Sequence, residues 1–286
     1  AVQVTDSNPI TLTYTQYTAD TSVITKLIGT YSFNVTNVTA TNVVSVAADT
    51  HVAKIILVPN SSLTEAQYNA VSTKVTNTDL TVTDVLVADL SLFATDNHIS
   101  KMTLVANSSI TETQFNSVST KLTNTDITVT NVIAADVNVI AASSQVVKIT
   151  LVPNSILTLA QLNSVSAKLT NSDITITNIQ VTDALTIAND AHVAKITLVA
   201  NSCITEVQFN SISTKLTNTD LIVTNVLVAD VTSLASNSKV ASVSVADTAA
   251  NISTSFNVLN SIGTKLTAVQ VTDSNPITLT YTQYTG

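Results

Sequence analysis

Arginine, tryptophan and glycine are scarce or absent in this chain, and each scarcity argues against a class of function. The 286 residues include eleven lysines but no arginine and no tryptophan, and the net charge is −8. Recognition of nucleic acids depends on clustered basic residues, so we expect neither a nucleic-acid partner nor a basic helix on a membrane surface. The three glycines, Gly29, Gly263 and Gly286, form no glycine-rich phosphate loop.

Cysteine and long apolar runs are also nearly absent. Cys203 is the only cysteine, so an intrachain disulfide is impossible. Repeats that are rich in Thr and Asn and lack disulfides are typical of bacterial proteins exported to the cell exterior. No apolar run approaches the roughly 18 residues of a membrane span, so we expect no transmembrane helix. No signal peptide begins at residue 1, and we expect the sequence to be part of a longer chain or a mature form.

The dominant feature of the sequence is a unit that recurs every 47 residues. Lys54, Lys101, Lys148 and Lys195 open four successive copies. A fixed period of this size is the signature of a repeat architecture. We therefore predict one continuous solenoid segment over 1–286, with units at approximately 1–53, 54–100, 101–147, 148–194, 195–241 and 242–286.

The two ends of the chain carry the same sequence. Residues 1–18, AVQVTDSNPITLTYTQYT, are identical to residues 268–285. One interpretation is a longer array whose super-repeat spans residues 1–267 and begins again at Ala268. The other is an engineered overlap at the ends.

The first half of a unit predicts a strand and a helix. Residues 101–105 alternate polar and apolar side chains, with Met102 and Leu104 on one face; we name this the lysine strand. A turn is predicted over Ala106–Ser109. A first helix follows over Thr111–Leu122, capped by Thr111 or Ser109, with Lys121 in its last turn, where a helix dipole favours a cation.

The second half of a unit predicts another strand and helix. The threonine strand spans Ile127–Ile133, and its apolar residues change parity, which predicts a bend or bulge near Asn131. A short second helix follows, with Asp136 as its N-cap and equivalents at Asp89, Asp183 and Asp230. Its final turn is predicted to hold the residues of one repeat position: His51, His98, Gln145, His192 and Lys239.

The terminal units diverge from this pattern. In the first unit, Ser32–Val38 match the threonine strand. The last unit predicts a longer helix that ends at Gly263, followed by a strand over Ala268–Asp273.

Strands joined by helical crossovers must run parallel. We therefore predict an α/β repeat solenoid with a parallel strand about every 24 residues and short helices in between. Stacked strands are about 4.8 Å apart but helices need about 8–10 Å, so such an array has to be curved or superhelical. The alternative is a two-sheet β-solenoid with 47-residue coils, in which lysine and threonine strands lie in separate sheets.

Three sets of repeated side chains are candidate binding sites, for Ca²⁺, for zinc and for ice. Oxygen-rich loops could bind Ca²⁺, which takes about six to eight oxygens; the candidate ligands are Asp79, Asp126, Asp173 and Asp220. Asx turns and side-chain hydrogen-bond ladders are the alternative for these aspartates and for the asparagines two residues before them.

The histidines His51, His98 and His192 could bind zinc, although Gln145 and Lys239 interrupt their row, which favours surface residues at a helix end.

The third set is a Thr-x-Thr row on the threonine strands, made of Thr81 and Thr83, Thr128 and Thr130, and Thr175 and Thr177. Such a ladder could bind ice, but Thr is also common on any solvated strand face. No nucleophile, base and orienting group recur as a set, so we predict no enzyme, no catalytic residues and no cofactor other than the Ca²⁺ that the aspartate loops could bind.

Two stretches carry a resemblance to a known kind of repeat. VADTAANISTSFNVLNSIGTKLTAVQVTD, residues 245–273, resembles the tandem repeats of giant secreted surface proteins of Gram-negative bacteria, and residues 10–38 resemble their companion half. The resemblance implies an adhesin, surface-layer or extracellular-fibre array, usually exported by a type I system. The resemblance brings no catalytic residue. From the 47-residue period and the repeated ends, we expect the partner to be the chain itself, as a homopolymer or as an end-to-end continuation of the array.

Overall fold

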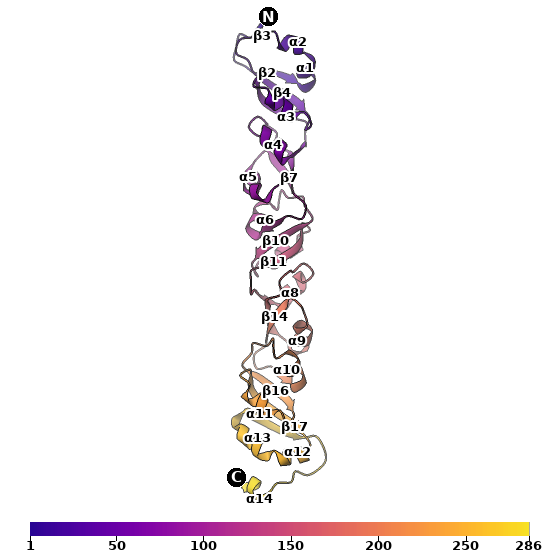
Figure 1. Cartoon of the computed structure of the whole chain (residues 1–286), viewed down its shortest axis with the longest axis vertical. Coiled ribbons are helices and arrows are strands. Elements are labelled where there is room, and N and C mark those ends of the chain that lie inside the picture. Colours follow the sequence, from indigo (N-terminus) through magenta and orange to yellow (C-terminus); the bar gives the residue numbers. More distant parts are fainter. Residues whose placement is uncertain (286) are drawn as a thin grey trace. The chain divides into compact units, whose positions relative to one another are not determined.

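The computed structural model describes residues 1–285, which form two compact units. One unit comprises 1–132 and 142–149, and the other comprises 133–141 and the residues from 150 onwards. In both units short parallel strands alternate with short helices, as predicted for an α/β repeat arrangement (Figure 1). No helix within residues 1–285 is long and apolar enough to cross a membrane.

The elements of the N-terminal half follow one another in a regular order. They are β1 (Val2–Gln3), β2 (Ile10–Thr13), α1 (Tyr14–Ala19), α2 (Thr21–Ile24), β3 (Leu27–Ile28), β4 (Phe33–Val38), α3 (Val43–Ala48), β5 (Val52–Leu57), β6 (Ser62–Thr64), α4 (Glu65–Val71), β7 (Leu80–Val85), η1 (Val87–Asp89), α5 (Leu90–Thr95), β8 (Ile99–Leu104), β9 (Ser109–Thr111), α6 (Glu112–Val118) and β10 (Ile127–Val132).

The C-terminal half continues the order. Its elements are α7 (Val137–Ala142), β11 (Val146–Leu151), β12 (Ile156–Thr158), α8 (Leu159–Val165), β13 (Ile174–Ile179), α9 (Val181–Ala188), β14 (Val193–Leu198), β15 (Cys203–Thr205), α10 (Glu206–Ile212), β16 (Leu221–Val226), α11 (Val231–Ser236), β17 (Val240–Asp247), α12 (Ala249–Thr254), α13 (Phe256–Ile262), η2 (Gly263–Lys265), β18 (Leu266–Val271) and α14 (Tyr281–Thr285).

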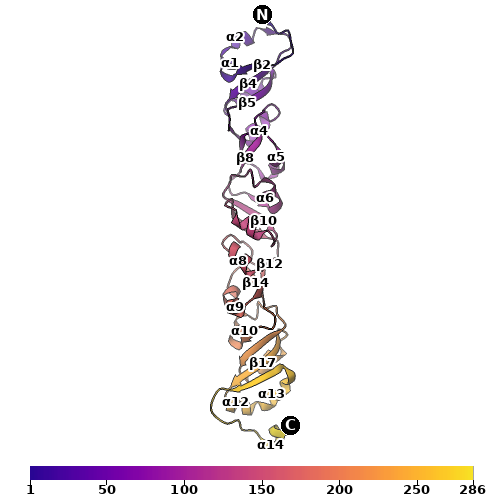
Figure 2. The ribbon, with the colours of Figure 1, turned by 180° about the vertical axis from the view of Figure 1, so that it is seen from behind.

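Each threonine strand lies in the same sheet as the lysine strand that follows it. The described sheets have the orders β1-β3, β2-β4-β5, β6-β7-β8, β9-β10-β11, β12-β13-β14 and β15-β16-β17-β18. Figure 2 shows β2, β4 and β5 side by side. The two-sheet alternative with 47-residue coils is therefore wrong, because lysine and threonine strands hydrogen-bond to each other.

The spacing of the strands alternates between two lengths, around the predicted average of about 24 residues. β4 begins at Phe33, β5 at Val52 and β7 at Leu80, so a short step from threonine strand to lysine strand alternates with a longer step to the next threonine strand. The longer step contains an extra short strand, such as β9, which pairs with the next threonine strand. Ser109 belongs to this strand, so the predicted turn over Ala106–Ser109 is one residue too long.

The core is formed by apolar side chains of both strand types and of the helices. Ile127, Val129 and Val132 of β10 are all fully buried, although their spacing would place Val132 on the opposite face of a regular strand. Asn131 has φ 57°, and this left-handed residue returns Val132 to the core. The predicted bulge is confirmed, as is the shared buried face of Met102 and Leu104.

The first helix is shorter than predicted. In α6 it begins at Glu112 and ends at Val118, because the chain then turns so that Leu122 can form a parallel bridge with Met102. Thr111 is the N-cap, and it forms a capping box with Gln114, which confirms one of the two predicted caps. Lys121 lies in the turn after the helix, so its predicted place in the last helical turn is wrong.

The prediction of an aspartate N-cap for the second helix is confirmed only in part, and the prediction for its final turn is wrong. Asp89 and Asp230 stand at N-cap positions, but neither side chain makes a capping hydrogen bond, and Asp183 lies inside the first turn of α9. The residues predicted for the final helical turn instead follow the helix: α5 ends at Thr95, and His98 lies in the connection to β8.

We call the stretch of chain from a residue to the residue that pairs with it one strand further along a coil. The last coil, in the unit 242–286, departs from the others, as predicted. Its helical segment is interrupted at Ser255, which separates α12 from α13. Gly263 ends α13 with φ 63°, a conformation that favours glycine, and this confirms its predicted role. The following strand, β18, begins and ends two residues earlier than predicted.

Candidate functional sites at the repeated polar positions

A buried asparagine continues the strand ladder with its side chain. The Asn124 side chain accepts a hydrogen bond from the Leu104 amide at 2.6 Å and donates to the Leu104 carbonyl at 3.2 Å. These are the two bonds that a neighbouring strand would supply, so the amide takes the place of a strand residue. The same pair recurs for Asn77 on Leu57, Asn171 on Leu151 and Asn218 on Leu198.

The Ca²⁺ candidate aspartates hold these asparagines in place. Asp126 accepts one hydrogen bond from the amide of Asn107 at 2.6 Å and another from the Asn124 side chain at 3.0 Å. These bonds, first from Asn107 and then from Asn124, hold the pKa of Asp126 below its usual range. The other three candidates, Asp79, Asp173 and Asp220, have equivalent partners and lowered pKa values.

The geometry of these loops is that of the predicted side-chain hydrogen-bond ladder. Both carboxylate oxygens of each aspartate accept a hydrogen bond from the protein. Among residues 1–285, no group of three or more His, Cys, Asp or Glu side chains is placed to hold a metal ion.

The lysine after each first helix reaches across to the neighbouring second helix. Lys74 Nζ donates to the carbonyls of Ala47 at 2.6 Å and Asp49 at 2.9 Å, at the C-terminal end of α3. The cation therefore meets the negative end of a helix dipole, but of the preceding coil and not of its own helix. Lys121, Lys168, Lys215 and Lys265 make equivalent contacts.

The histidine position also joins neighbouring coils. His192 Nε2 lies 3.1 Å from the Leu169 carbonyl oxygen, and the Gln145 amide donates to the Leu122 carbonyl at 2.5 Å. Lys239 reaches the carbonyl of Ser213 in the corresponding turn. Three different side chains thus place a nitrogen against the turn that follows a first helix. This shared contact accounts for the interchange of His, Gln and Lys, which a zinc ligand position would not tolerate.

Two of the histidines belong to Tyr–Asp–His clusters that sequence reasoning missed. Tyr68 donates to one Asp96 oxygen, and His98 Nδ1 lies 2.8 Å from the other. Burial and then the Asp96 carboxylate raise the pKa of Tyr68. Burial opposes ionisation of Asp96, but the hydrogen bonds from Tyr68 and His98 outweigh it and lower its pKa. Tyr17, Asp49 and His51 form the same cluster.

A buried glutamate also recurs at one repeat position, as Glu65, Glu112 and Glu206, and it was not predicted from the sequence. Glu65 accepts a hydrogen bond from the Leu86 amide at 2.7 Å, and burial followed by the nearby Asp89 raises its pKa. Its recurrence at one repeat position was the available signal. Glu206 has the same arrangement with Leu227 and Asp230.

The Thr-x-Thr pairs do not stack on one another from strand to strand. Thr81 pairs with Ser62 on one side and Lys101 on the other, and Thr175 lies next to Lys195. The second threonine of each pair does have a threonine neighbour, as Thr83 has Thr64 and Thr177 has Thr158. A continuous threonine face requires threonine neighbours at both positions, and the lysines beside Thr81 and Thr175 interrupt it.

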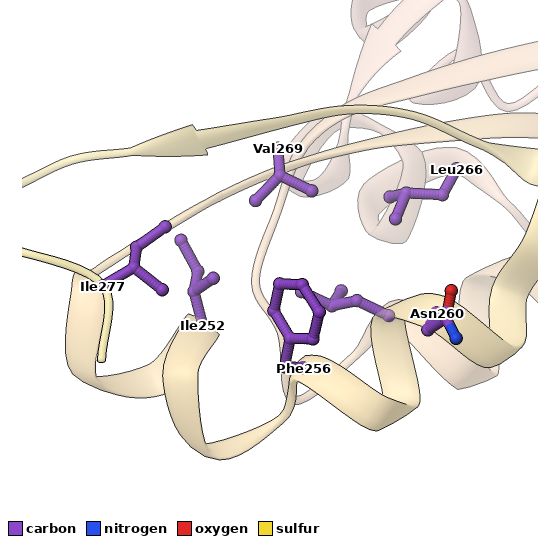
Figure 3. Close-up of a pocket in the computed structure, with 7 residues that line it drawn as sticks. Ile252, Phe256, Asn260, Leu266, Val269 and Ile277 are labelled. Carbon is purple, nitrogen blue, oxygen red and sulfur yellow. The ribbon is translucent and has the colours of Figure 1, made fainter. Parts of the chain in front are cut away.

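An apolar pocket of about 250 Å³ lies in the last coil. Figure 3 shows Phe256 and Ile252, from the helices, facing Val269 and Leu266 of β18, with Ile277 closing one side. The pocket contains one polar side chain, Asn260, so its chemistry is that of an incompletely filled core.

Comparisons of the chain with protein-family models, with curated proteins and with solved structures yielded no match.

Proposed function

We propose that this chain is a structural repeat protein, an α/β solenoid whose stacked coils form a fibre, sheet or adhesin stalk. Its partner is the chain itself, as a homopolymer or as the continuation of one array end to end. By its resemblance to giant secreted repeat proteins, its place is the bacterial cell surface or exterior, reached by type I export. We propose no catalytic role.

The observation that carries this proposal is where the repeated polar residues direct their hydrogen bonds. The asparagine, lysine and histidine positions bond from one coil to the adjacent coil, as Asn124 does to Leu104, Lys168 to Ala141 and His192 to Leu169. A repeat array is stabilised by the interfaces between neighbouring repeats, and here polar side chains supply part of each interface. Residues used in this way serve stacking and leave few free groups for chemistry.

The competing proposal is a repetitive binding surface, either a Ca²⁺-dependent adhesin or an ice-binding face. The hydrogen-bonded aspartates and the lysines beside Thr81 and Thr175 both weigh against it. Addition of a chelator is expected to leave the thermal unfolding temperature unchanged. A large decrease, or inhibition of ice recrystallisation by the protein, would favour the binding surface.

The test of the structural proposal is the state of the purified chain in solution. We expect light scattering and negative-stain electron microscopy to show concentration-dependent association into elongated particles. Compact, monodisperse monomers at every concentration would overturn the proposal.

A further inference from the structure

The sequence repeated at the two ends adopts two different structures in the same molecule. Residues Ile10–Thr13 form β2, which pairs in parallel with β4, whereas the identical residues 277–280 form no strand. The helix start is the same in both places: Thr13 and Gln16 form the capping bonds that Thr280 and Gln283 form. The helix therefore begins in both copies because of the local sequence, whereas residues 10–13 form a strand only because β4 is there to pair with them.

Each copy of this sequence is packed on one side only. At the N-terminal end the downstream side is covered: the Tyr17 hydroxyl donates to Asp49 at 2.6 Å, and its ring centroid lies 5.9 Å from that of Phe33. At the C-terminal end the upstream side is held, because Gln283 donates to the Ser253 carbonyl at 3.1 Å. Its second tyrosine, Tyr284, is 80% exposed.

The apolar contacts are divided in the same way. Ile10 lies with Leu27 and Phe33 of the downstream coil around a small cavity of about 220 Å³. The equivalent residue, Ile277, lines the pocket formed with Phe256 and Val269 of the upstream coil (Figure 3). One copy shows the core that the other copy lacks.

We propose that residues 268–285 of one molecule replace residues 1–18 on residues 19–49 of a second molecule, which joins the two head to tail. This inference rests on the self-association put forward in the proposed function and specifies its joint. The joint keeps the register that residues 10–17 show. Ile277 of the first molecule then lies beside Phe33 of the second, and Thr278 lies beside Asn34 of the second. Tyr284 of the first molecule donates a hydrogen bond to Asp49 of the second.

The exchange conserves contacts and reduces the number of ordered segments. In two separate molecules the repeated sequence is ordered once on its upstream side and once on its downstream side. In the joint, one segment makes both sets of contacts and the displaced residues 1–18 are released. The conformational entropy of the released segment opposes the entropy lost on association, as in domain swapping.

The proposal predicts opposite effects of one substitution at two identical positions. Tyr284→Ala removes a side chain that is exposed in the separate molecule but, in the joint, would be half-buried and hydrogen-bonded as Tyr17 is, so it should weaken association at least about tenfold. Tyr17→Ala weakens the segment to be displaced while Tyr284 remains, so it should strengthen association by a similar factor. Sedimentation velocity over a concentration series measures both. The control is Thr285→Ala, because Thr285 and its N-terminal equivalent Thr18 are both exposed.

Disulfide trapping tests the register. In a Cys203→Ser background, a Thr278→Cys chain mixed with an Asn34→Cys chain should yield a covalent dimer on mild oxidation. The control mixes the Thr278→Cys chain with a Thr36→Cys chain, which is out of register and should give little dimer.

The outcomes separate this joint from the proposed function. Opposite effects of the two tyrosine substitutions, with dimer trapped in register, support the joint. If the wild-type chain associates but Tyr284→Ala and Tyr17→Ala change association equally or not at all, the joint is wrong and the structural proposal stands. If the wild-type chain does not associate at any concentration, both fail.

Discussion

Asn124 shows how a single side chain joins two coils of this protein. It is 6% exposed and makes three hydrogen bonds, two to the backbone of Leu104 and one to Asp126. A buried backbone group that loses its partner costs about 1–3 kcal/mol. Asn carries a donor N–H and an acceptor oxygen on separate atoms, as a peptide group does, whereas ionised Asp has no donor and Ser carries both functions on one oxygen; Asn can therefore replace a strand residue at this place.

Substitution of this residue gives the first prediction. Asn124→Ala should lower the free energy of unfolding by about 2–4 kcal/mol, because the amide and carbonyl of Leu104 are left unpaired. Urea denaturation followed by circular dichroism measures the change. The control is Asn116→Ala, at an exposed position in α6, which should change stability by less than about 0.5 kcal/mol. Equal effects at the two positions would contradict the ladder.

Glu206 gives a prediction that depends on pH. Burial and then Asp230 raise its pKa above the ordinary 4.5, so at a pH between 4.5 and the raised pKa the folded state keeps a proton that the unfolded state has released. As pH rises from 4.5 through the higher pKa of the folded state, the wild-type protein loses stability. Glu206→Gln can still accept the hydrogen bond from Leu227 but does not ionise.

The variant should therefore be more stable than the wild type near about pH 7, and the difference should disappear below about pH 4. Thermal unfolding at several pH values measures this difference. A substitution at exposed Asp20, Asp20→Asn, serves as the control. A Glu206→Gln variant that is less stable at neutral pH would show that the charge is needed.

Among the strands and helices, the features that depend on residues close together in the sequence were predicted correctly. The parity change around Asn131 was visible as an apolar pattern, and Thr111 was a recognisable cap, since both features depend on residues close together in the chain. The strand β9 and the early end of α6 were not predictable in this way. Both depend on pairing with residues of an adjacent coil, namely Thr128 for Ser109 and Met102 for Leu122.

For the polar sites too, the sequence predicted the positions of the residues but not their partners in adjacent coils. The repeat marked the positions of Asp126 and Lys121, and Asx turns were one of the two interpretations of the aspartates. The prediction that Lys121 interacts with the end of its own helix was wrong, because the carbonyls that it meets, those of Phe93 and Asp96, belong to the preceding coil. A sequence period shows which residues are equivalent, but the spatial neighbour of a long side chain depends on how the coils stack.

This contact between elements gives a further prediction. Lys215 Nζ donates to the carbonyls of Ala188 and Val193 at 2.5 and 2.7 Å. Lys215→Met keeps the aliphatic stem and removes the cation, so it should cost about 1–2 kcal/mol of stability. Lys195→Met, at an exposed strand position in the same unit, should be nearly neutral. Chemical denaturation measures both, and a neutral Lys215→Met would exclude a stabilising role for the cation.

At the scale of the whole molecule, the equivalence of the units can be tested by removing one of them. Deletion of residues 195–241 joins Ala194 to Ser242, and Ser242 stands at the repeat position of Lys195. In the intact chain Lys265 contacts Ala235 and Val240, the residues one repeat period after Ala188 and Val193. After the deletion, Lys265 can take over the contacts that Lys215 makes.

We therefore expect the shortened chain to fold, with the same circular dichroism per residue and a single cooperative unfolding transition, because each interface between neighbouring coils is regenerated. Deletion of 195–218, about half a unit, is the control. It removes the helix α10 and leaves a threonine strand where a lysine strand is required, so the capping and ladder residues no longer meet their partners. Cooperative unfolding should be lost in this control. If both deletions unfold alike, the 47-residue unit is not the element of stability, and the coil-to-coil hydrogen bonds are incidental to it.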